Sequence, residues 1–388
     1  MKKALVVGGN SGVGLAIVTN LLREYDHVYI VGKDEIAEYA APCRSISEFE
    51  NKTTFYKLNF VNDDFSLFDE ISDINALVIT AGFGRVALFE DLTEVELKNL
   101  LNVNFTSVVR ILKKYYSKIK GSEDFYTAVM GSISGHVSSP YFAAYGAAKS
   151  GLCRFIENVN IELSQTGCNN RILDVSPGSI KGTAFHGGEE DLSLVNGLAV
   201  EIIAKMHKRE TLYVPQYEET YRAVMERYRN APEAFGEQSY EYKKNGGRVS
   251  DKPQVIVGYL SGTFDLFHIG HLNLLRRAKE HCDYLIVGVH ESGSWKGKET
   301  YIPFEERCKI LESVRYVDQV VTSPLEDSEA WDLYRFHKLF VGSDYKGTER
   351  FNRYEKLLSG KAEIIYFPYT QGTSSTQLRV ALSEGRKS

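Results

Sequence analysis

Three residues in the first half of the chain could together move a proton to or from an alcohol oxygen. Tyr145 and Lys149 are four residues apart in a predicted helix, so their side chains share one face. Ser132 lies thirteen residues before Tyr145, at the end of a predicted strand. A phenol ordinarily titrates near ~10, and a nearby ammonium group favours its ionised form. A Tyr–Lys pair can therefore exchange a proton near neutral pH, while the serine hydroxyl holds a carbonyl oxygen.

A second group of residues could stabilise charge on a phosphate. His268 and His271 are three residues apart at the predicted start of a helix, where both can point at one anion. Paired imidazoles and backbone N–H groups can stabilise the charge that grows during nucleotidyl transfer. Zinc is a rival ligand for this histidine pair, but no third ligand stands at metal-site spacing. We therefore predict no metal centre.

The elements that must position these residues alternate between strands and helices, as in βαβ units with a parallel sheet. In the first part of the chain the predicted strands are Ala4–Val7, His27–Val31, Thr54–Leu58, Ala76–Thr80, Tyr126–Met130 and Ile172–Val175. In the second part they are Val255–Tyr259, Tyr284–Val289, Gln319–Thr322, Leu339–Gly342 and Glu363–Phe367. The sequence therefore predicts an α/β fold with two Rossmann-like parallel-sheet domains.

The strand pattern fades after about Tyr240 and resumes at Val255. The segment between them is polar and rich in turn-forming residues, which is typical of a linker. We predict a first domain over 1–243, a linker over 244–253 and a second domain over 254–388. Each predicted domain opens with its own glycine-bearing motif.

Composition excludes several other classes of protein. The 388 residues carry a net charge of −5, with 27 basic and 32 acidic residues up to Ser250 and 19 of each beyond it. Neither part has the basic excess of a nucleic-acid-binding protein, and no apolar run approaches the ~20 residues of a membrane span. Five scattered cysteines without a CxxC pair argue against a disulfide scaffold or a structural zinc site. The apolar start, Ala4–Val7, is too short for a signal peptide, so we expect a cytoplasmic protein without nucleic-acid or membrane partners.

The first strand runs into a glycine-rich turn that can hold a pyrophosphate at a helix N-terminus. With Ser132, Tyr145 and Lys149, this turn resembles the short-chain dehydrogenase/reductase family over roughly residues 1–240. The resemblance implies that Ser132, Tyr145, Lys149 and Asn104 are catalytic, with Asn104 in a proton relay. The implied cofactor-binding residues are Gly8, Gly9, Asn10, Ser11, Gly12, Val13, Gly14, Lys33, Asn59, Ala81, Gly82, Tyr145, Lys149, Pro177, Gly178 and Thr183.

Cofactor choice depends on the end of the second predicted strand. A site that prefers NAD usually has an acid there to hold the ribose 2′-hydroxyl. Here the position is Gly32, followed by the basic Lys33, although Asp34 comes next. The resemblance therefore favours NADPH over NADH, with Lys33 on the 2′-phosphate. Asn59 stands where the family often has an aspartate beside adenine.

The run from Gly262 to His271 resembles the cytidylyltransferase family, most closely its glycerol-3-phosphate cytidylyltransferase type. The match covers nearly all of residues 255–382. It implies CTP as a substrate, with Mg²⁺ to neutralise the triphosphate. The implied nucleotide-binding residues are Gly262, Thr263, Phe264, His268, His271, Lys296, Lys298, Arg307, Asp344, Gly372, Ser374, Ser375 and Thr376, of which His268 and His271 are also catalytic.

The last motif of the second domain departs from the family pattern. Tyr369 stands where the family has a phosphate-facing arginine, and Gln371 replaces a glutamate, while Arg379 follows one turn later. These changes keep an alternative open, in which the chain is an NADPH-dependent reductase whose second domain only senses nucleotide.

Two such sites on one chain suggest consecutive reactions. A reductase and a cytidylyltransferase together would convert a ketose phosphate, CTP and NADPH into a CDP-alditol, for capsule or teichoic-acid-like polymer synthesis. CDP-ribitol and a CDP-hexitol such as CDP-glucitol are candidate products, and the order of the two steps is open. Arg85, Lys181 and His186 could hold a phosphate near the first site. Both resemblances imply a homo-oligomer.

Overall fold

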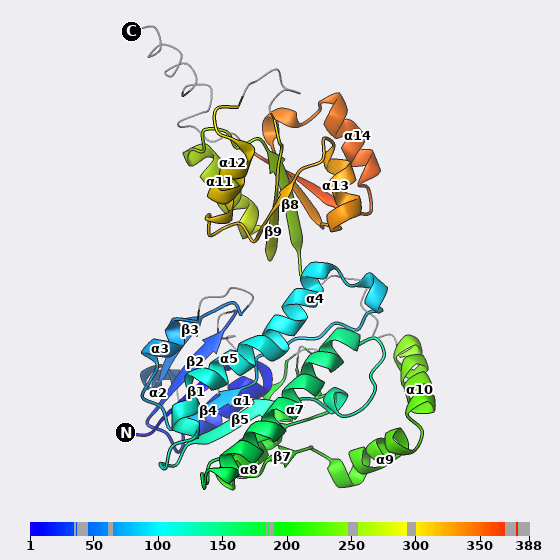
Figure 1. Cartoon of the computed structure of the whole chain (residues 1–388). Helices are drawn as coiled ribbons and strands as arrows, with labels where there is room; N and C mark the ends of the chain where they lie inside the picture. The colour runs from blue at the N-terminus through cyan, green and yellow to red at the C-terminus, as the bar shows by residue number, and fades with distance from the viewer. Residues whose placement is uncertain are drawn as a thin grey trace. The chain divides into compact units, whose positions relative to one another are not determined.

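The computed structural model describes residues 1–34, 36, 46–60, 65–183, 185, 190–246, 255–292, 300–368 and 378. The chain divides into two compact units, Met1–Asp251 and Lys252–Ser388. Each unit is built around one parallel sheet with helices on both faces (Figure 1). The predicted α/β fold with two parallel-sheet domains is therefore confirmed.

The sheet of the first unit has seven parallel strands in the order β3-β2-β1-β4-β5-β6-β7. The strands are β1 (Lys3–Val7), β2 (His27–Gly32), β3 (Thr53–Lys57), β4 (Ala76–Ile79), β5 (Tyr126–Met130), β6 (Ile172–Val175) and β7 (Leu212–Tyr213). The helices are α1 (Gly12–Leu21), α2 (Ile46–Lys52), α3 (Leu67–Glu70), α4 (Glu94–Leu101), α5 (Ser107–Lys114), α6 (Tyr116–Ile119), α7 (Ala143–Gln165), α8 (Leu192–His207), α9 (Arg222–Asn230) and α10 (Pro232–Asn245).

Strand β1 shows how the two faces of this sheet are buried. Ala4 and Val6 point into one apolar cluster with α1 and α8. Leu5 and Val7 point into the opposite cluster with α5 and α7. Because successive residues of a strand face opposite sides, a strand buried on both faces must be apolar throughout. This explains the continuous apolar run at the start of the chain.

The second unit has five parallel strands in the order β10-β9-β8-β11-β12. The strands are β8 (Val257–Gly262), β9 (Tyr284–Val289), β10 (Gln319–Thr322), β11 (Lys338–Gly342) and β12 (Glu363–Phe367). The helices are α11 (Ile269–Glu280), α12 (Phe304–Glu312), α13 (Asp327–Tyr334) and α14 (Glu349–Leu357). Helices α11 and α12 cover one face, and α13 and α14 cover the other (Figure 1).

Both predicted sites lie at a point where the strand order reverses. In the first unit β1 pairs with β2 on one side and β4 on the other. In the second unit β8 likewise pairs with β9 and β11. Ligands of open α/β sheets bind outside the carboxyl ends of the strands at such a reversal. The glycine-rich turn follows β1, and the segment with both histidines follows β8.

The predicted strands agree with the structure apart from small shifts and one omission. The eighth strand begins at Val257 rather than Val255 and continues through Gly262. The sequence analysis missed the two-residue β7, which is too short to show a period. Helix α10 continues through Asn245, so the first two residues of the predicted linker are helical.

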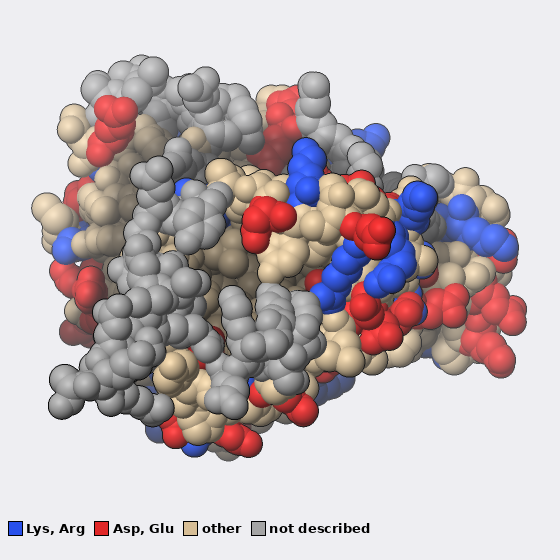
Figure 2. All heavy atoms as spheres, turned by 90° about the horizontal axis from the view of Figure 1, so that it is seen from above, with Lys and Arg blue, Asp and Glu red and all other residues tan. Residues whose placement is uncertain are grey.

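No helix in the described ranges is long and apolar enough to cross a membrane. On the face shown in Figure 2, basic and acidic side chains lie beside one another. The second unit contains close pairs of this kind, such as Arg276 with Glu280 and Arg353 with Glu326, each at 2.7 Å.

Adding a methyl group should have opposite effects on stability at two glycines, one packed in the turn after β1 and one exposed on helix α8. A Cβ on Gly14 would overlap the carbonyl oxygen of Gly8 and lie 2.5 Å from the Thr80 Oγ1. We expect Gly14→Ala to lower the free energy of unfolding by about 2 kcal/mol. Gly197, exposed in helix α8, has nothing within 4 Å of its Cβ position, so Gly197→Ala should raise that free energy by roughly 0.5–1 kcal/mol. Urea unfolding of both variants tests this, and equal effects would contradict it.

Candidate active sites

The turn between β1 and α1 brings backbone close to backbone. Gly8 has φ +86°, a conformation that favours glycine, and a Cβ there would lie 2.8 Å from the Cα of Ala81. Thr80 holds the turn by donating from its hydroxyl to the Gly8 carbonyl at 3.0 Å. Helix α1 begins at Gly12 with no acidic residue in its first turn. The positive end of this helix is therefore suited to an anion such as a pyrophosphate.

Further predicted cofactor residues lie at Thr183 and in the turn after β6. Thr183 lies near Gly12, because a Cβ on Gly12 would be 3.6 Å from the Thr183 Cγ2. The carbonyl of Pro177 accepts from the Ile133 N–H at 2.9 Å, which ties the turn after β6 to the segment after β5. Next to it, the Tyr221 hydroxyl fills the space where a Cβ on Gly178 would stand.

The ends of β2 and β3 carry the residues predicted to choose the cofactor. Lys33 is exposed and follows β2 directly. Asn59 follows β3, and the Leu58 N–H donates to the Gly32 carbonyl at 2.8 Å, which holds the two strand ends together. A Cβ on Gly32 would overlap the Asn10 side chain. The roles of Lys33 and Asn59 in cofactor choice remain predictions.

The structure brings the three predicted catalytic side chains together at the end of β5. Ser132 and Tyr145 are both buried, and the Ser132 hydroxyl lies close enough to the phenol to lower the pKa of Tyr145. Lys149 is only 2% exposed, and its Nζ donates to the Met130 carbonyl at 2.7 Å. That Nζ lies 5.8 Å from the centre of the Tyr145 ring. The geometry can therefore carry out the predicted proton exchange.

Burial shifts both titrating groups of this pair. Burial raises the pKa of Tyr145 to about 12, and the nearby Ser132 hydroxyl opposes the rise. Burial lowers the pKa of Lys149 to about 8, and electrostatic interactions with Cys153 and Asp174 oppose the shift. The phenol is therefore protonated at neutral pH, as a general acid must be when a ketone is reduced.

Asn104 stands on an irregular turn between α4 and α5. The segment Asn102–Thr106 is a π-helix, an insertion that often marks functional sites. The Asn104 Nδ2 donates to the carbonyls of Phe83, at 2.8 Å, and Leu100, at 3.0 Å. Its Oδ1 is buried and has no hydrogen-bond partner in the described part of the chain. A Cβ on Gly82 would lie 2.8 Å from that oxygen and 3.4 Å from the Lys149 Nζ, so the acceptor faces the site.

Sequence reasoning missed the aromatic surroundings of Tyr145. The rings of Phe142 and Phe185 have centroids 5.3 and 5.4 Å from that of Tyr145, and they stack on each other at 6.1 Å. The sequence analysis also considered Arg85 as a phosphate ligand. Its Nη1 instead pairs with the buried Glu96 carboxylate at 2.8 Å, inside the unit.

In the second unit, the segment after β8 places two imidazoles at the start of α11. His268 is the N-cap, and its Nδ1 accepts from the Gly270 N–H at 3.0 Å. An Nδ1 that accepts leaves the proton of a neutral imidazole on Nε2, where it can be donated to a phosphate oxygen. The His268 and His271 rings are stacked with centroids 4.0 Å apart, and the buried His271 Nδ1 has no hydrogen-bond partner in the described residues.

Both imidazoles are neutral in the protein alone. Burial, together with the neighbouring His268, lowers the pKa of His271 to about 3, and Asp265 opposes the shift. Burial also lowers the pKa of His268. The site therefore offers N–H donors at a helix N-terminus rather than fixed positive charge, and it can gain a proton only when an anion arrives.

Two buried charged residues hold the loops around this histidine pair. The Asp265 carboxylate accepts from the backbone N–H groups of Tyr301, at 3.1 Å, and Ile302, at 2.9 Å. Arg307 is 1% exposed, and its guanidinium donates to four backbone carbonyls. These carbonyls belong to Thr263, His290, Glu291 and Ile302. In this structure the Arg307 side chain joins the loops, and its predicted contact with nucleotide stays a prediction.

The remaining predicted nucleotide residues fall into two groups. Gly262 ends β8, and Phe264 has φ +53°, which gives the next residues a sharp turn toward α11. Asp344 is exposed in the turn after β11. The other predicted residues lie outside the described residues, namely Lys296, Lys298, Gly372, Ser374, Ser375 and Thr376. The departures at Tyr369 and Gln371 lie outside them too, as does Arg379.

The buried Lys149 predicts a pH-dependent stability. Its pKa is about 8 in the folded protein and 10.5 as a free side chain, so the unfolded chain binds more protons between these values. The free energy of unfolding of the wild type should therefore rise with pH, relative to Lys149→Met, by up to ~1.4 kcal/mol per pH unit in this range. Urea unfolding at pH 7.5 and 10 measures the difference. Comparison of the wild type with Lys149→Gln should give the same dependence on pH. If the wild type and the variants differ in free energy of unfolding by the same amount at both pH values, the prediction is wrong.

Comparison with known proteins agrees with this geometry. Residues 2–191 match the family described as short chain dehydrogenase, and residues 259–381 match the family described as cytidylyltransferase-like. Carbonyl reductase family member 4 of Xenopus tropicalis is 28% identical over 192 residues, which are 49% of this chain and 80% of that protein. A solved short-chain dehydrogenase from Sphingobium yanoikuyae in complex with NADPH is 19% identical with a TM-score of 0.50, and the match covers 66% of this chain and 97% of that one. That likeness shows the fold of the first unit.

The second unit has relatives of higher identity. The glycerol-3-phosphate cytidylyltransferase of Staphylococcus aureus is 40% identical over 125 residues, which are 31% of this chain and 90% of that protein. That of Bacillus subtilis is 36% identical over 122 residues, again covering 90% of the relative. The chain therefore belongs to the cytidylyltransferase family and joins that domain to an N-terminal short-chain dehydrogenase domain, as a bifunctional reductase and nucleotidyltransferase.

Proposed function

We propose that this enzyme makes a CDP-alditol from a ketose phosphate, CTP and NADPH. The observation that carries the proposal is the presence of two assembled sites on one chain. One holds a general acid, Tyr145, beside the buried Lys149. The other holds the stacked pair His268 and His271 at a helix N-terminus. An alditol phosphate is the product that fits the first site and the substrate that fits the second.

The reductase residues have separate tasks in this reaction. The glycine turn after β1 would hold NADPH, which would supply a hydride for the ketone carbon. The Ser132 hydroxyl positions the carbonyl oxygen, and Tyr145 gives that oxygen its proton. Lys149 favours the phenolate that remains. The buried Asn104 Oδ1, which faces Lys149 across Gly82, can accept a proton-relay hydrogen bond.

In the second unit the substrate phosphate attacks the α-phosphorus of CTP, taken up as its Mg²⁺ complex, and pyrophosphate leaves. Negative charge grows on the α-phosphate and on the leaving group. The His268 and His271 N–H groups, with the N-terminus of α11, can donate to this charge. The names of the relatives support the substrate class, because glycerol 3-phosphate is itself an alditol phosphate.

Several finer features belong to the same proposal. We expect NADPH rather than NADH, with Lys33 on its 2′-phosphate. A cytoplasmic homo-oligomer that feeds capsule or teichoic-acid-like polymer synthesis fits the chemistry. CDP-ribitol and a CDP-hexitol such as CDP-glucitol are the products to look for first.

A mass-spectrometric screen of the full chain tests the proposal. The reactions contain CTP, Mg²⁺ and a panel of ketose and alditol phosphates, with and without NADPH. We expect one ketose phosphate to give a CDP-alditol only when NADPH is present. A CDP-ketose that accumulates without NADPH would place cytidylyl transfer first, and an alditol phosphate formed without CTP would show that reduction can come first. If no substrate gives a nucleotide product, the proposal is wrong and the nucleotide-sensing alternative is favoured.

Two variants provide reciprocal controls for this screen. Tyr145→Phe removes the general acid and should slow reduction by about 10²–10⁴-fold while cytidylyl transfer to the alditol phosphate continues. His268→Asn keeps an N-cap acceptor for α11 but removes the imidazole, and it should slow cytidylyl transfer by about 10²–10³-fold while reduction continues. Product formation by His268→Asn at the wild-type rate would show that the histidine pair does not catalyse the transfer.

A further inference from the structure

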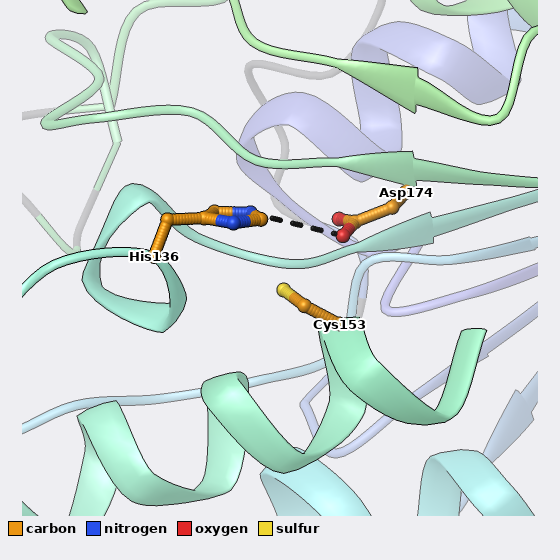
Figure 3. Close-up of side chains that lie close together, drawn as sticks. All are labelled: His136, Cys153 and Asp174. Carbon is orange, nitrogen blue, oxygen red and sulfur yellow. Dashed lines mark ion pairs between the residues drawn. The ribbon is translucent and has the colours of Figure 1, made fainter. Parts of the chain in front are cut away.

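A polar cluster packs against helix α7, and His136 is its partly exposed member. Figure 3 shows three of its members, namely His136 just after a 3₁₀ turn, Cys153 on α7 and Asp174 on β6. The fourth is Ser176, which directly follows β6. The Ser176 hydroxyl donates to the Asp174 Oδ1 at 2.8 Å and lies 3.0 Å from the His136 Nε2. The Cys153 Sγ lies 3.6 Å from the same hydroxyl.

These side chains hold one another rather than an empty ion site. The histidine, cysteine and aspartate ligand atoms all lie within 4.8 Å of one another, and such a set would suit zinc. However, the Ser176 hydroxyl stands among them and is within hydrogen-bonding reach of all three. Their donors and acceptors are therefore satisfied by the chain itself. The remaining question is why a carboxylate is kept inside the protein.

The carboxylate and the Lys149 ammonium group converge on two consecutive residues. The Lys149 Nζ donates to the Met130 carbonyl at the end of β5. At Gly131, the next residue, the Asp174 Oδ1 and the Ser176 hydroxyl occupy the space where a Cβ would stand. Strand pairing fixes this arrangement, because Val129 of β5 lies opposite Asp174 of β6. Gly131 thus leaves room for the carboxylate to approach the end of the strand that receives Lys149.

Among the cluster residues near Lys149, Asp174 is the one with a carboxylate. Lys149 is 2% exposed and Asp174 4% exposed, so neither charge is well hydrated. Burial raises the pKa of Cys153 to about 12 and of Tyr145 to about 12, so both are neutral near pH 7. Burial lowers the pKa of His136, against the effect of Asp174, so this imidazole is neutral there too.

We propose that Asp174 is a positioning residue of the reductase site, whose buried carboxylate, held by Ser176, is the counter-charge that keeps Lys149 in its ammonium form beside Tyr145. The proposal deepens the reductase half of the proposed function and rests on it. The carboxylate acts through Lys149 and touches neither substrate nor cofactor.

A double-mutant cycle on the full chain tests the charge coupling without any substrate. It compares the wild type, Lys149→Met, Asp174→Asn and the double variant by urea unfolding. At pH 7 we expect the two positions to be coupled by about tenfold in the unfolding equilibrium constant. At pH 10 Lys149 is neutral, so the coupling should disappear. If Asp174→Asn does not fold, Asp174→Ala replaces it in the same double-mutant cycle.

A second buried carboxylate provides the matched control. Glu96 is 1% exposed and pairs with Arg85, so a cycle of Lys149→Met with Glu96→Gln should show no coupling that changes with pH. Absence of coupling between Lys149 and Asp174 at pH 7 would overturn the proposal. Coupling of equal size at pH 7 and pH 10 would overturn it as well, because it would show packing rather than charge.

The pH profile of ketone reduction tests the same idea in catalysis, with the ketose phosphate identified by the product screen. Loss of a nearby negative charge lowers the pKa of the coupled Tyr145–Lys149 pair. Asp174→Asn should therefore move the alkaline limb of kcat to lower pH by about one unit, whereas Cys153→Ala should leave it in place. An unmoved limb in Asp174→Asn would overturn the proposal. If the wild type reduces no ketose phosphate, the substrate proposal fails and the cycle alone decides on Asp174.

Discussion

The reductase unit is organised around an ammonium group that has been taken out of water. Lys149 is almost fully buried, and an unpaired buried charge is among the costliest groups in a protein. Polar atoms of the chain lie around the ammonium group and offset part of this cost. The Met130 carbonyl accepts from it, the Asn104 Oδ1 faces it, and Gly82 contributes no side chain that would separate the two. Tyr145 gains its electrostatic partner because the fold tolerates the burial of Lys149.

The second unit meets the opposite requirement, since its substrates bring the charge with them. The histidine pair is neutral before they arrive, because burial lowers the pKa of both rings. Fixed positive charge is used instead in the framework, where the Arg307 guanidinium joins carbonyls of the segment after β8 to carbonyls of the connection between β9 and α12. The site itself relies on N–H donors and the N-terminus of α11. Such donors can follow charge as it moves between phosphates during transfer.

Sequence patterns predicted what depends on local period and spacing. The strands appeared as short apolar runs because both faces of each sheet are covered, and Tyr145 with Lys149 could be placed on one helix face. The patterns did not show the π-helical turn that aims Asn104 inward, since one extra residue in a turn leaves no periodic trace. They also could not tell that Arg307 serves the loops, because a buried guanidinium chooses its partners through tertiary contacts. The sequence likewise carried no signal for Asp174, because its neighbours come from separate parts of the chain, namely β6, the end of β5 and α7.

The contrast between the two sites explains why the two reactions occupy two sheets. Ketone reduction needs a neutral substrate carbonyl beside a protonated tyrosine and a balanced, buried charge. Cytidylyl transfer must hold a triphosphate and a phosphate at one point, which adds several negative charges at once. In the first unit Lys149 and Asp174 are both buried, whereas the second unit presents two imidazoles at a helix N-terminus. The reversals of strand order beside β1 and β8 each offer a helix N-terminus, so each reaction has its own sheet and its own anion-binding end.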